Sequence, residues 1–169
     1  MNNRQEVLDR FIKHVVSQAK RNLTTSGKNA SKKLYNSIQG EAKAFPNSIG
    51  IYFDMEDYGF FQDKGVSGIK KKYNTPFSYK TKMPPPSAFD KWTIRRGIAP
   101  RNTKGQFQTR KGLNFAIARS IFEKGIKPSL FFTKPFEAAY KNLPNELIDK
   151  YGLDVIELFD SIMKPNFKK

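Results

Sequence analysis

The sequence predicts an α+β fold in which a small antiparallel sheet, of about three to four strands, is flanked by a long N-terminal helix and by C-terminal helices, with long basic loops. Two patterns predict this class. Apolar residues recur at three- and four-residue steps near the start of the chain, which is the period of a helix. Apolar and polar residues then alternate over two neighbouring segments, which is the period of a strand. We expect a single domain over residues 1–169, with an insertion of helices and basic loop at 84–127.

The first helix is expected over Asn3 to Leu23, where the apolar side chains share one face. A polar break that contains a glycine and a short second helix follow it. Alternation over Gln39 to Phe45 and over Ser48 to Asp54 predicts two strands. Because Pro46 and Asn47 between them are typical turn residues, the two strands are expected to form a β-hairpin.

The segment YGFFQDKG, from Tyr58 to Gly65, places three aromatic rings close together. Asp54 and Asp57 precede it, and acidic residues favour a helix N-terminus, so a short helix is expected here. Val66 to Pro76 is typical of a long, mobile, basic loop. Phe77 to Met83 alternates again and is a third strand candidate.

Two more helices are expected in the insertion. Ser87, with Asp90 three residues later, predicts the start of a helix that ends at Gly97. The stretch from Ala99 to Lys111 is polar, basic and loop-like, and Leu113 to Lys124 returns to the helical period.

The chain is expected to return to the sheet and then to end in helices. Lys127 to Phe132 is predicted to be extended. Thr133 is predicted to cap a further helix that has Pro135 at its first position, where a missing amide hydrogen costs nothing. A last amphipathic helix is expected after Pro144, and the residues on its apolar line are Ile148, Tyr151, Val155, Phe159 and Ile162.

Charge is the most informative feature of the composition. The chain has 31 Lys and Arg against 15 Asp and Glu, a net charge of +16, which favours contact with a polyanion or an acidic protein surface. From Lys64 to Lys111 there are 13 basic residues and one acidic residue, whereas Phe136 to Met163 carries six acidic residues and two lysines. A basic middle and an acidic end suit a subunit that binds its own copies, and they also suit a DNA-binding protein.

The sequence indicates no enzyme, no metal site and no cofactor. His14, the only histidine, lies inside the first helix, where a structural or surface role is the simpler interpretation. Asp54, Glu56 and Asp57 are oxygen ligands of the kind that hard cations bind, but helix capping explains them more simply. There is no cysteine, no zinc-ligand spacing and no glycine-rich phosphate loop. No apolar run is long enough to span a membrane.

Basic residues interleaved with aromatic rings also suit nucleic-acid binding. Such runs lie at Lys70 to Tyr73, at Trp92 to Arg96 and at Arg101 to Arg110, and solvated loops and helix faces are the alternative interpretation. Trp92 is expected to anchor its helix in the core. The candidate residues for contact with DNA or an acidic partner are Lys70, Lys71, Lys72, Arg95, Arg96, Arg101, Lys104, Arg110 and Lys111.

Three segments carry a resemblance to a known family: SGKNASKKLYNSI (26–38), YGFFQDKG (58–65) and FFTKPFEAA (131–139). In this order they resemble the motifs G-x-L-x-x-S-I, Y-A-x-x-x-E-x-G and P-F-x-x-P-A of the tail-completion, or head-tail connector, family of tailed bacteriophages, related to the lambda Z-type minor structural proteins. The matching residues are Leu34, Ser37 and Ile38, then Tyr58, Gly59 and Gly65, then Pro135, Phe136 and Ala139. The chain departs from the pattern in having Gly59 in place of alanine, Asp63 near the usual acid, and Ala138 in place of the second proline.

The resemblance implies a non-enzymatic virion protein that is made in the host cytoplasm and forms a homo-oligomeric ring, a hexamer or dodecamer, in the neck at the head-tail junction. Its partners would be the neck proteins on the portal side and the tail side, together with genomic double-stranded DNA in the channel, contacted nonspecifically. Candidate residues of the subunit interface are Tyr58, Phe60, Phe61, Gly65, Phe131, Phe132, Pro135 and Phe136.

Three questions stay open in the sequence. The rings of YGFFQDKG either cover the hairpin within one subunit or also contact the next subunit. The basic loops face either DNA or acidic neighbours, including Glu146 to Asp160 of an adjacent copy. The alternative function, from another class, is that of a free, basic nucleic-acid-binding protein.

Overall fold

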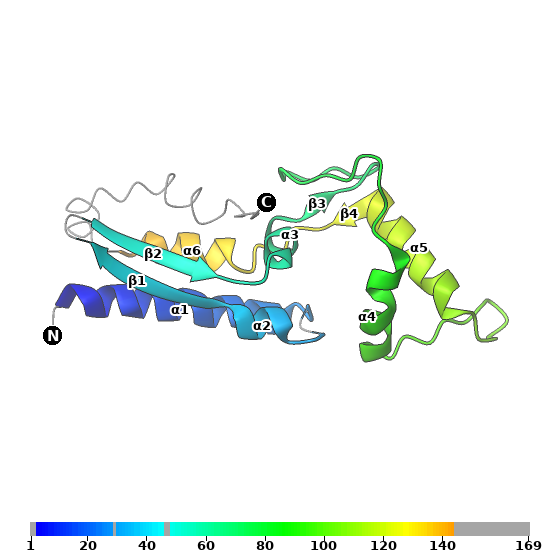
Figure 1. The fold of residues 1–169 in the computed structure, drawn as a ribbon, viewed down its shortest axis with the longest axis horizontal. Coiled ribbons are helices and arrows are strands. Elements are labelled where there is room, and N and C mark those ends of the chain that lie inside the picture. Colours follow the sequence, from blue (N-terminus) through cyan, green and yellow to red (C-terminus); the bar gives the residue numbers. More distant parts are fainter. Residues whose placement is uncertain (1–2, 29, 46–47, 144–169) are drawn as a thin grey trace. The chain divides into compact units, whose positions relative to one another are not determined.

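The structure of the chain is a computed structural model, and it describes residues 3–28, 30–45 and 48–143. Within these residues, helices combine with short strands that form two antiparallel sheets of two strands each (Figure 1). The predicted α+β class is therefore confirmed, although the strands form two small sheets where one was expected. The last helix predicted, beyond Pro144, lies outside the described residues.

The chain divides into two compact units. The first unit consists of Met1–Asn29, Lys33–Asp63 and Leu130–Lys169, and the second consists of Ala30–Lys32 and Lys64–Ser129. The insertion expected at 84–127 lies inside the second unit, which begins earlier along the chain, at Lys64.

The first unit is built on a long helix and a β-hairpin. Its elements are α1 (Asn3–Thr25), α2 (Lys33–Ser37), β1 (Gln39–Phe45), β2 (Ser48–Asp54), α3 (Tyr58–Lys64, whose last residue belongs to the second unit) and α6 (Thr133–Tyr140). β1 and β2 pair antiparallel, from Gln39 opposite Asp54 to Phe45 opposite Ser48, as predicted. The turn residues predicted between them, Pro46 and Asn47, lie outside the described residues.

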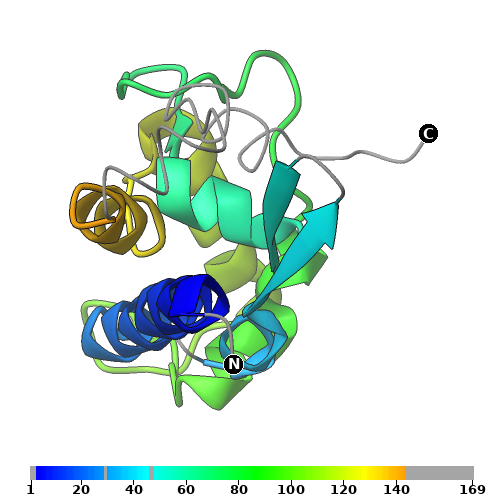
Figure 2. The same cartoon turned by 90° about the vertical axis from the view of Figure 1, so that its left-hand side faces the viewer.

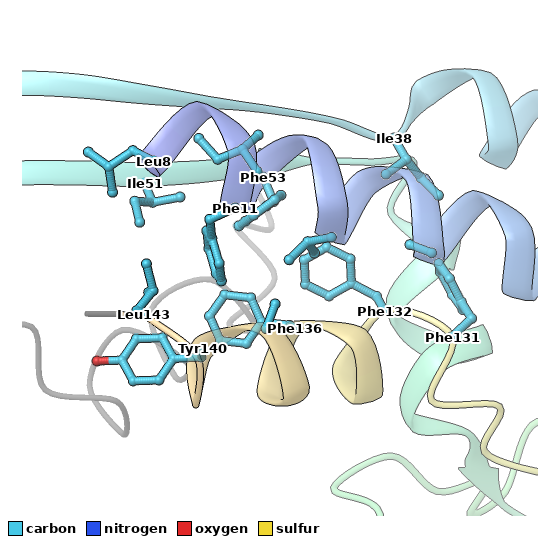
Figure 3. Packing of buried hydrophobic residues seen from close by; sticks show 14 of the residues in the cluster. Leu8, Phe11, Ile38, Ile51, Phe53, Phe131, Phe132, Phe136, Tyr140 and Leu143 are labelled. Carbon is cyan, nitrogen blue, oxygen red and sulfur yellow. The ribbon is translucent and has the colours of Figure 1, made fainter. Parts of the chain in front are cut away.

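One apolar core holds α1, the hairpin and α6 together. Figure 2 shows these three elements on different sides of the space that the core fills, and α1 contacts both β1 and α6. Phe53 of β2 lies with its ring centroid 5.1 Å from that of Phe132 and 5.9 Å from that of Phe136, both edge to face. The ring of Phe11 on α1 contacts Phe53 and Phe136 in the same geometry (Figure 3), which is favourable for aromatic pairs.

The N-terminus of α6 is capped by a carboxylate from another helix. Asp63 of α3 is fully buried, and its Oδ1 accepts hydrogen bonds from the amides of Phe132 at 2.8 Å and Thr133 at 3.2 Å. Its Oδ2 accepts a hydrogen bond from Thr133 Oγ1. The prediction that Thr133 is the cap is therefore wrong, because Thr133 is the first residue of the helix and donates to the cap. Pro135 lies within the first turn, where no hydrogen bond is lost.

The second unit is built on two helices and a very short ribbon. Its elements are β3 (Val66–Ser67), the 3₁₀ helix η1 (Pro86–Phe89), α4 (Asp90–Arg95), α5 (Arg110–Lys124) and β4 (Gly125–Ile126). β3 pairs antiparallel with β4. The helix predicted to end at Gly97 is confirmed, and Gly97 has the positive φ, 62°, that favours glycine after a helix. The helix predicted at Leu113 begins three residues earlier, because Thr109 Oγ1 accepts a hydrogen bond from the Gly112 amide and caps it.

Two predictions for this unit are wrong. Phe77 to Met83 is not a strand: it makes a single bridge, Ser67 to Ser78, because β3 is too short to pair with more of it. The side chain of Ser87 does not cap α4. The carboxylate of Asp90 instead accepts a hydrogen bond from Asn114 Nδ2 at 3.3 Å, which ties α4 to α5.

Few apolar side chains are buried in the second unit. Among its described residues, Val66 and Ala118 are the buried hydrophobic ones, whereas the buried residues of the large core all belong to the first unit. Thr93 and Asn114 are buried polar residues that hydrogen-bond each other at 3.4 Å. The packing of this unit therefore includes buried hydrogen-bonded polar groups beside a small number of buried apolar side chains.

Candidate polyanion-binding surface

The net charge of the chain is concentrated in the second unit. This unit contains 17 Lys and Arg against 2 Asp and Glu, a net charge of +15, whereas the first unit contains 14 against 13, a net charge of +1. All nine residues predicted to contact DNA or an acidic partner belong to the second unit and are exposed. The fold therefore combines a nearly neutral unit that has a large core with a strongly basic unit that has a small one.

The lysine loop, residues 69–72, lies against the C-terminal end of α5. The amide of Ile69 donates to the carbonyl of Phe122 at 3.0 Å, and the amides of Lys70 and Lys71 donate to the carbonyl of Glu123 at 2.9 and 3.2 Å. These bonds satisfy carbonyl groups that a helix C-terminus leaves unpaired. Of the loop predicted over Val66 to Pro76, Val66 and Ser67 instead form β3, and the backbone of Ile69 to Lys71 is hydrogen-bonded to α5.

Glu123 is the acidic residue that anchors this loop. Its carboxylate lies 2.9 Å from Lys70 Nζ and 3.1 Å from Arg119 Nε. The hydrogen bonds from Lys70 and then from Arg119 lower the pKa of Glu123 below its usual value of 4.5. Since the folded chain has the lower pKa, this carboxylate stabilises it above the usual pKa, and the contribution is lost as the pH falls through the lowered pKa.

We expect the substitution K70Q to raise the pKa of Glu123 toward its usual value, because the largest cause of the shift is then removed. The pKa is measured by following the side-chain carboxyl carbon of Glu123 in an NMR titration. The variant K72Q, which removes the same charge two residues away, is the control and should leave the Glu123 pKa nearly unchanged. Equal shifts in both variants would show that net charge, and not the Lys70 contact, determines this pKa.

The basic segment from Arg101 to Phe107 forms a hydrogen-bonded turn before α5. Arg101 and Phe107 form a bridge, and Asn102 Oδ1 accepts hydrogen bonds from the amides of Lys104 and Gln106, both at 2.9 Å. Gly105 has a φ of 74° at the tip. An asparagine side chain stabilises a turn when it accepts hydrogen bonds from the backbone amides that follow it. The segment is loop-like, as predicted, and it holds Arg101 and Lys104 exposed on a defined backbone.

Each of the three basic and aromatic runs contains a cation positioned over a ring. Lys71 Nζ lies 5.5 Å from the centre of the Tyr73 ring, and the guanidinium of Arg96 lies 6.0 Å from the ring of Trp92. The guanidinium of Arg101 lies 4.1 Å from the ring of Phe107. Such pairs are attractive and hold the cation on the surface. Trp92 is 39% exposed, so the prediction that it anchors its helix in the core is wrong.

The residues predicted for a subunit interface fall into two groups. Phe131, Phe132, Pro135 and Phe136 are buried in the first unit (Figure 3 labels the three phenylalanines), so they are part of its core. The other group lies on or after α3: Tyr58 is 40% exposed, Phe60 and Phe61 are half-buried, and Gly65 is buried. Of the eight residues, Tyr58 therefore has the largest surface available to a second subunit.

The three motifs of the resemblance lie mainly in the first unit; residues 30–32 of the first motif and Lys64 and Gly65 of the second belong to the second unit. Ser37 Oγ of the first motif accepts a hydrogen bond from the amide of Glu56 at 3.0 Å. A side chain at Gly59 of the second motif would lie 2.8 Å from Leu34 Cδ1, because Leu34 and Met55 fill that space, and this explains the glycine there. Asp63, at the acidic position of the second motif, caps the helix that carries the third.

The helix and strand predictions do not indicate the structural roles of Asp63 and Gly68, and they indicate Gly125 only as the residue after the helix that ends at Lys124, where the structure has it. In the sequence Asp63 is only an acid near a motif position, whereas in the structure its buried carboxylate joins two of the motifs. Gly68 and Gly125 lie where β3 and β4 approach each other closely. A glycine beside a strand often marks a place where two backbones approach closely, and this is the pattern that indicates such a role for Gly68 and Gly125.

The described residues contain no cluster of three or more His, Cys, Asp or Glu side chains suited to a metal ion. Glu56, one of the candidate acids, pairs with Lys33 at 2.8 Å. None of the described helices is long and apolar enough to cross a membrane. His14 is exposed on α1 and borders a shallow groove together with Arg10 and Asn142.

Comparison with known proteins gave no match to a family model, to a curated protein or to a solved structure. The resemblance to the head-tail connector family therefore rests on the three motifs alone and stays a prediction.

Proposed function

We propose that the chain is a structural subunit of a tailed-bacteriophage neck, which forms an oligomeric ring and joins or completes the head-tail connection around the DNA channel. The observation that carries this proposal is the set of contacts that join residues of the three motifs in the first unit. Leu34 packs where Gly59 leaves space, and Asp63 caps the helix of the third motif. Residues that resemble a family only in sequence order have no need to contact one another, so their contact supports a shared fold.

In this proposal the second unit supplies the contact with DNA. The genome passes a neck without being read in sequence, so the contact needs positive charge and no recognition of bases. The net charge of +15 on this unit and the exposed row of Lys70, Lys71 and Lys72 meet that requirement. No catalytic step is part of the proposed function.

The second candidate function is that of a free nucleic-acid-binding protein. It is favoured by the three cations that lie over the half-buried ring of Tyr73 and the exposed rings of Trp92 and Phe107, because unpaired bases stack on aromatic rings in basic surfaces. Under this alternative the protein would act in the host cytoplasm and would be absent from particles.

Immunogold labelling of purified, nuclease-treated particles of the phage that encodes the chain tests the proposed function. We expect label at the head-tail junction and at no other site on the particle. Intact particles that lack the chain, together with a soluble pool of the chain that carries nucleic acid, would contradict the neck function and support the second candidate.

We expect the double substitution K71Q/K72Q to weaken binding to double-stranded DNA by about tenfold at moderate salt and to reduce the slope of log K against log salt by about 2, since two phosphate contacts are lost. Binding is measured by fluorescence anisotropy over a salt series. The matched control is K134Q/K141Q, which removes two exposed lysines of the first unit, Lys134 in α6 and Lys141 directly after it. Equal losses in the two variants would show that binding depends on net charge alone.

A further inference from the structure

The second unit has an apolar cleft at the N-terminal end of α5. This open cavity, of about 440 Å³, is lined by side chains from α4, from the turn that follows and from the start of α5, among them Ile94, Ile98, Pro100, Phe107 and Arg110. Ile94 is 52% exposed and Phe107 is 71% exposed. Large hydrophobic side chains gathered at one exposed cavity are typical of a surface that a partner covers.

The rim of the cleft is basic. Arg110 borders it directly, Lys111 follows on α5, and Arg101 lies over the ring of Phe107 at 4.1 Å. The two acidic residues of the unit bind other side chains and do not neutralise this rim: Asp90 accepts a hydrogen bond from Asn114, and Glu123 pairs with Lys70 and Arg119. The cleft therefore fits a segment that presents apolar side chains on one face and carboxylates beside them.

The cleft is separate from the lysine loop. Arg110 begins α5, whereas the loop is bonded to Glu123, about 20 Å away along the helix axis at 1.5 Å per residue. Figure 1 shows the turn before α5 and the loop next to β3 at opposite ends of this helix. DNA bound at the lysine loop would gain nothing from apolar side chains at the other end, since phosphates need only charge. The cleft thus calls for a different occupant.

We propose that the cleft binds the acidic C-terminal segment of a second copy of the chain, residues 144–163. This segment follows Leu143, the last described residue, and carries five acidic residues and one lysine. Its apolar residues recur at three- and four-residue steps from Ile148 to Ile162, so it has the chemistry that the cleft requires. The contact is heterologous, because each copy offers a cleft to one neighbour and a segment to the other, and such contacts form a ring when the rotation between neighbours closes.

This inference rests on the proposed ring function, and it is tested in solution with the full chain. We expect the wild type to self-associate in a concentration-dependent manner in analytical ultracentrifugation at low salt. The cleft variant R110E/K111E and the segment variant D154K/E157K should each associate at least about tenfold more weakly. Acidic residues in the first turn favour a helix, so R110E/K111E should not unfold α5.

The decisive measurement is an equimolar mixture of these two variants. The unchanged segment of the first variant matches the unchanged cleft of the second, and the two reversed surfaces also carry opposite charges, so the mixture should regain the association that each variant lacks by itself. The matched control K71E/K72E carries the same charge change at the other end of α5 and should still self-associate. The variant I94S, which removes an apolar side chain from the cleft and keeps all charges, should also associate more weakly.

Three results would overturn the inference: a wild type that stays monomeric at all concentrations, a mixture that regains no association, or a control that dissociates as much as the cleft variant. Failure of this contact and failure of the proposed function are distinguishable. Label at the head-tail junction with no regained association in the mixture would remove only the cleft contact. Regained association in the mixture with no label on particles would keep the contact and remove the neck function.

Discussion

Substitution of Asp63 by alanine is expected to lower the free energy of unfolding of the first unit by about 3 kcal/mol, since it leaves buried donors without an acceptor. The donors are the amides of Phe132 and Thr133 and the hydroxyl of Thr133, all bonded to the one carboxylate. The loss also removes the side-chain link between α3 and α6, because this carboxylate is the cap of α6. The measurement is urea unfolding followed by far-ultraviolet circular dichroism.

Two further variants separate capping from simple loss of charge. D63N keeps one acceptor oxygen and should lose about 1 to 2 kcal/mol, less than the alanine variant, because a neutral cap is weaker. E137A removes an exposed carboxylate from the same helix and should change stability by less than about 0.5 kcal/mol. Trp92, the only tryptophan, lies in the second unit, so its fluorescence reports that unit separately. A D63A variant as stable as E137A would contradict the assigned role of the buried cap.

The first unit was largely predictable because its elements bury one face each. The helical period over the start of the chain and the alternation over the hairpin both reflect a large core, and the structure has α1, β1 and β2 there. The cap of α6 was not predictable, since Asp63 and Thr133 are 70 residues apart in the sequence. Local capping rules assign a cap to the nearest suitable side chain, which was Thr133.

The second unit was less predictable because it lacks such a core. α4 and α5 follow local signals, but the alternation at Phe77 to Met83 did not produce a strand. A strand forms only where a partner edge exists, and β3 is two residues long. The same lack of a core leaves Trp92 exposed, where the sequence indicated an anchor.

The candidate surface was predicted in its residues but not in its arrangement. The basic residues were evident from charge alone, and all nine are exposed. Their division into a lysine loop at one end of α5 and an arginine-rimmed cleft at the other depends on contacts between distant segments. The amides of Lys70 and Lys71 bond Glu123, for example, and no local pattern in the sequence indicates such a bond.

Substitution of Gly125 by alanine is expected to unfold the ribbon that joins the two ends of the second unit. Gly125 has a φ of 74°, and a Cβ atom there would lie 2.1 Å from the carbonyl oxygen of Val66 and 2.5 Å from the amide nitrogen of Gly68. Both neighbours are backbone atoms that cannot move without breaking the β3–β4 pairing. We expect a loss of about 3 kcal/mol or more, measured as the shift in urea unfolding followed by Trp92 fluorescence.

Alanine substitutions at two other glycines distinguish the cost of a positive φ from the cost of a steric clash. Gly97 has a φ of 62° but nothing within 4 Å of a Cβ atom, so G97A should cost only the backbone strain of about 1 kcal/mol. At Gly68 a Cβ atom would lie 2.3 Å from the carbonyl oxygen of Glu123, so G68A tests the conflict without positive φ. Because that carbonyl accepts the amides of Lys70 and Lys71, G68A should also release the lysine loop and weaken DNA binding, whereas G97A should not. Similar losses of stability in G125A and G97A would mean that β3 and β4 do not approach as closely as this fold requires.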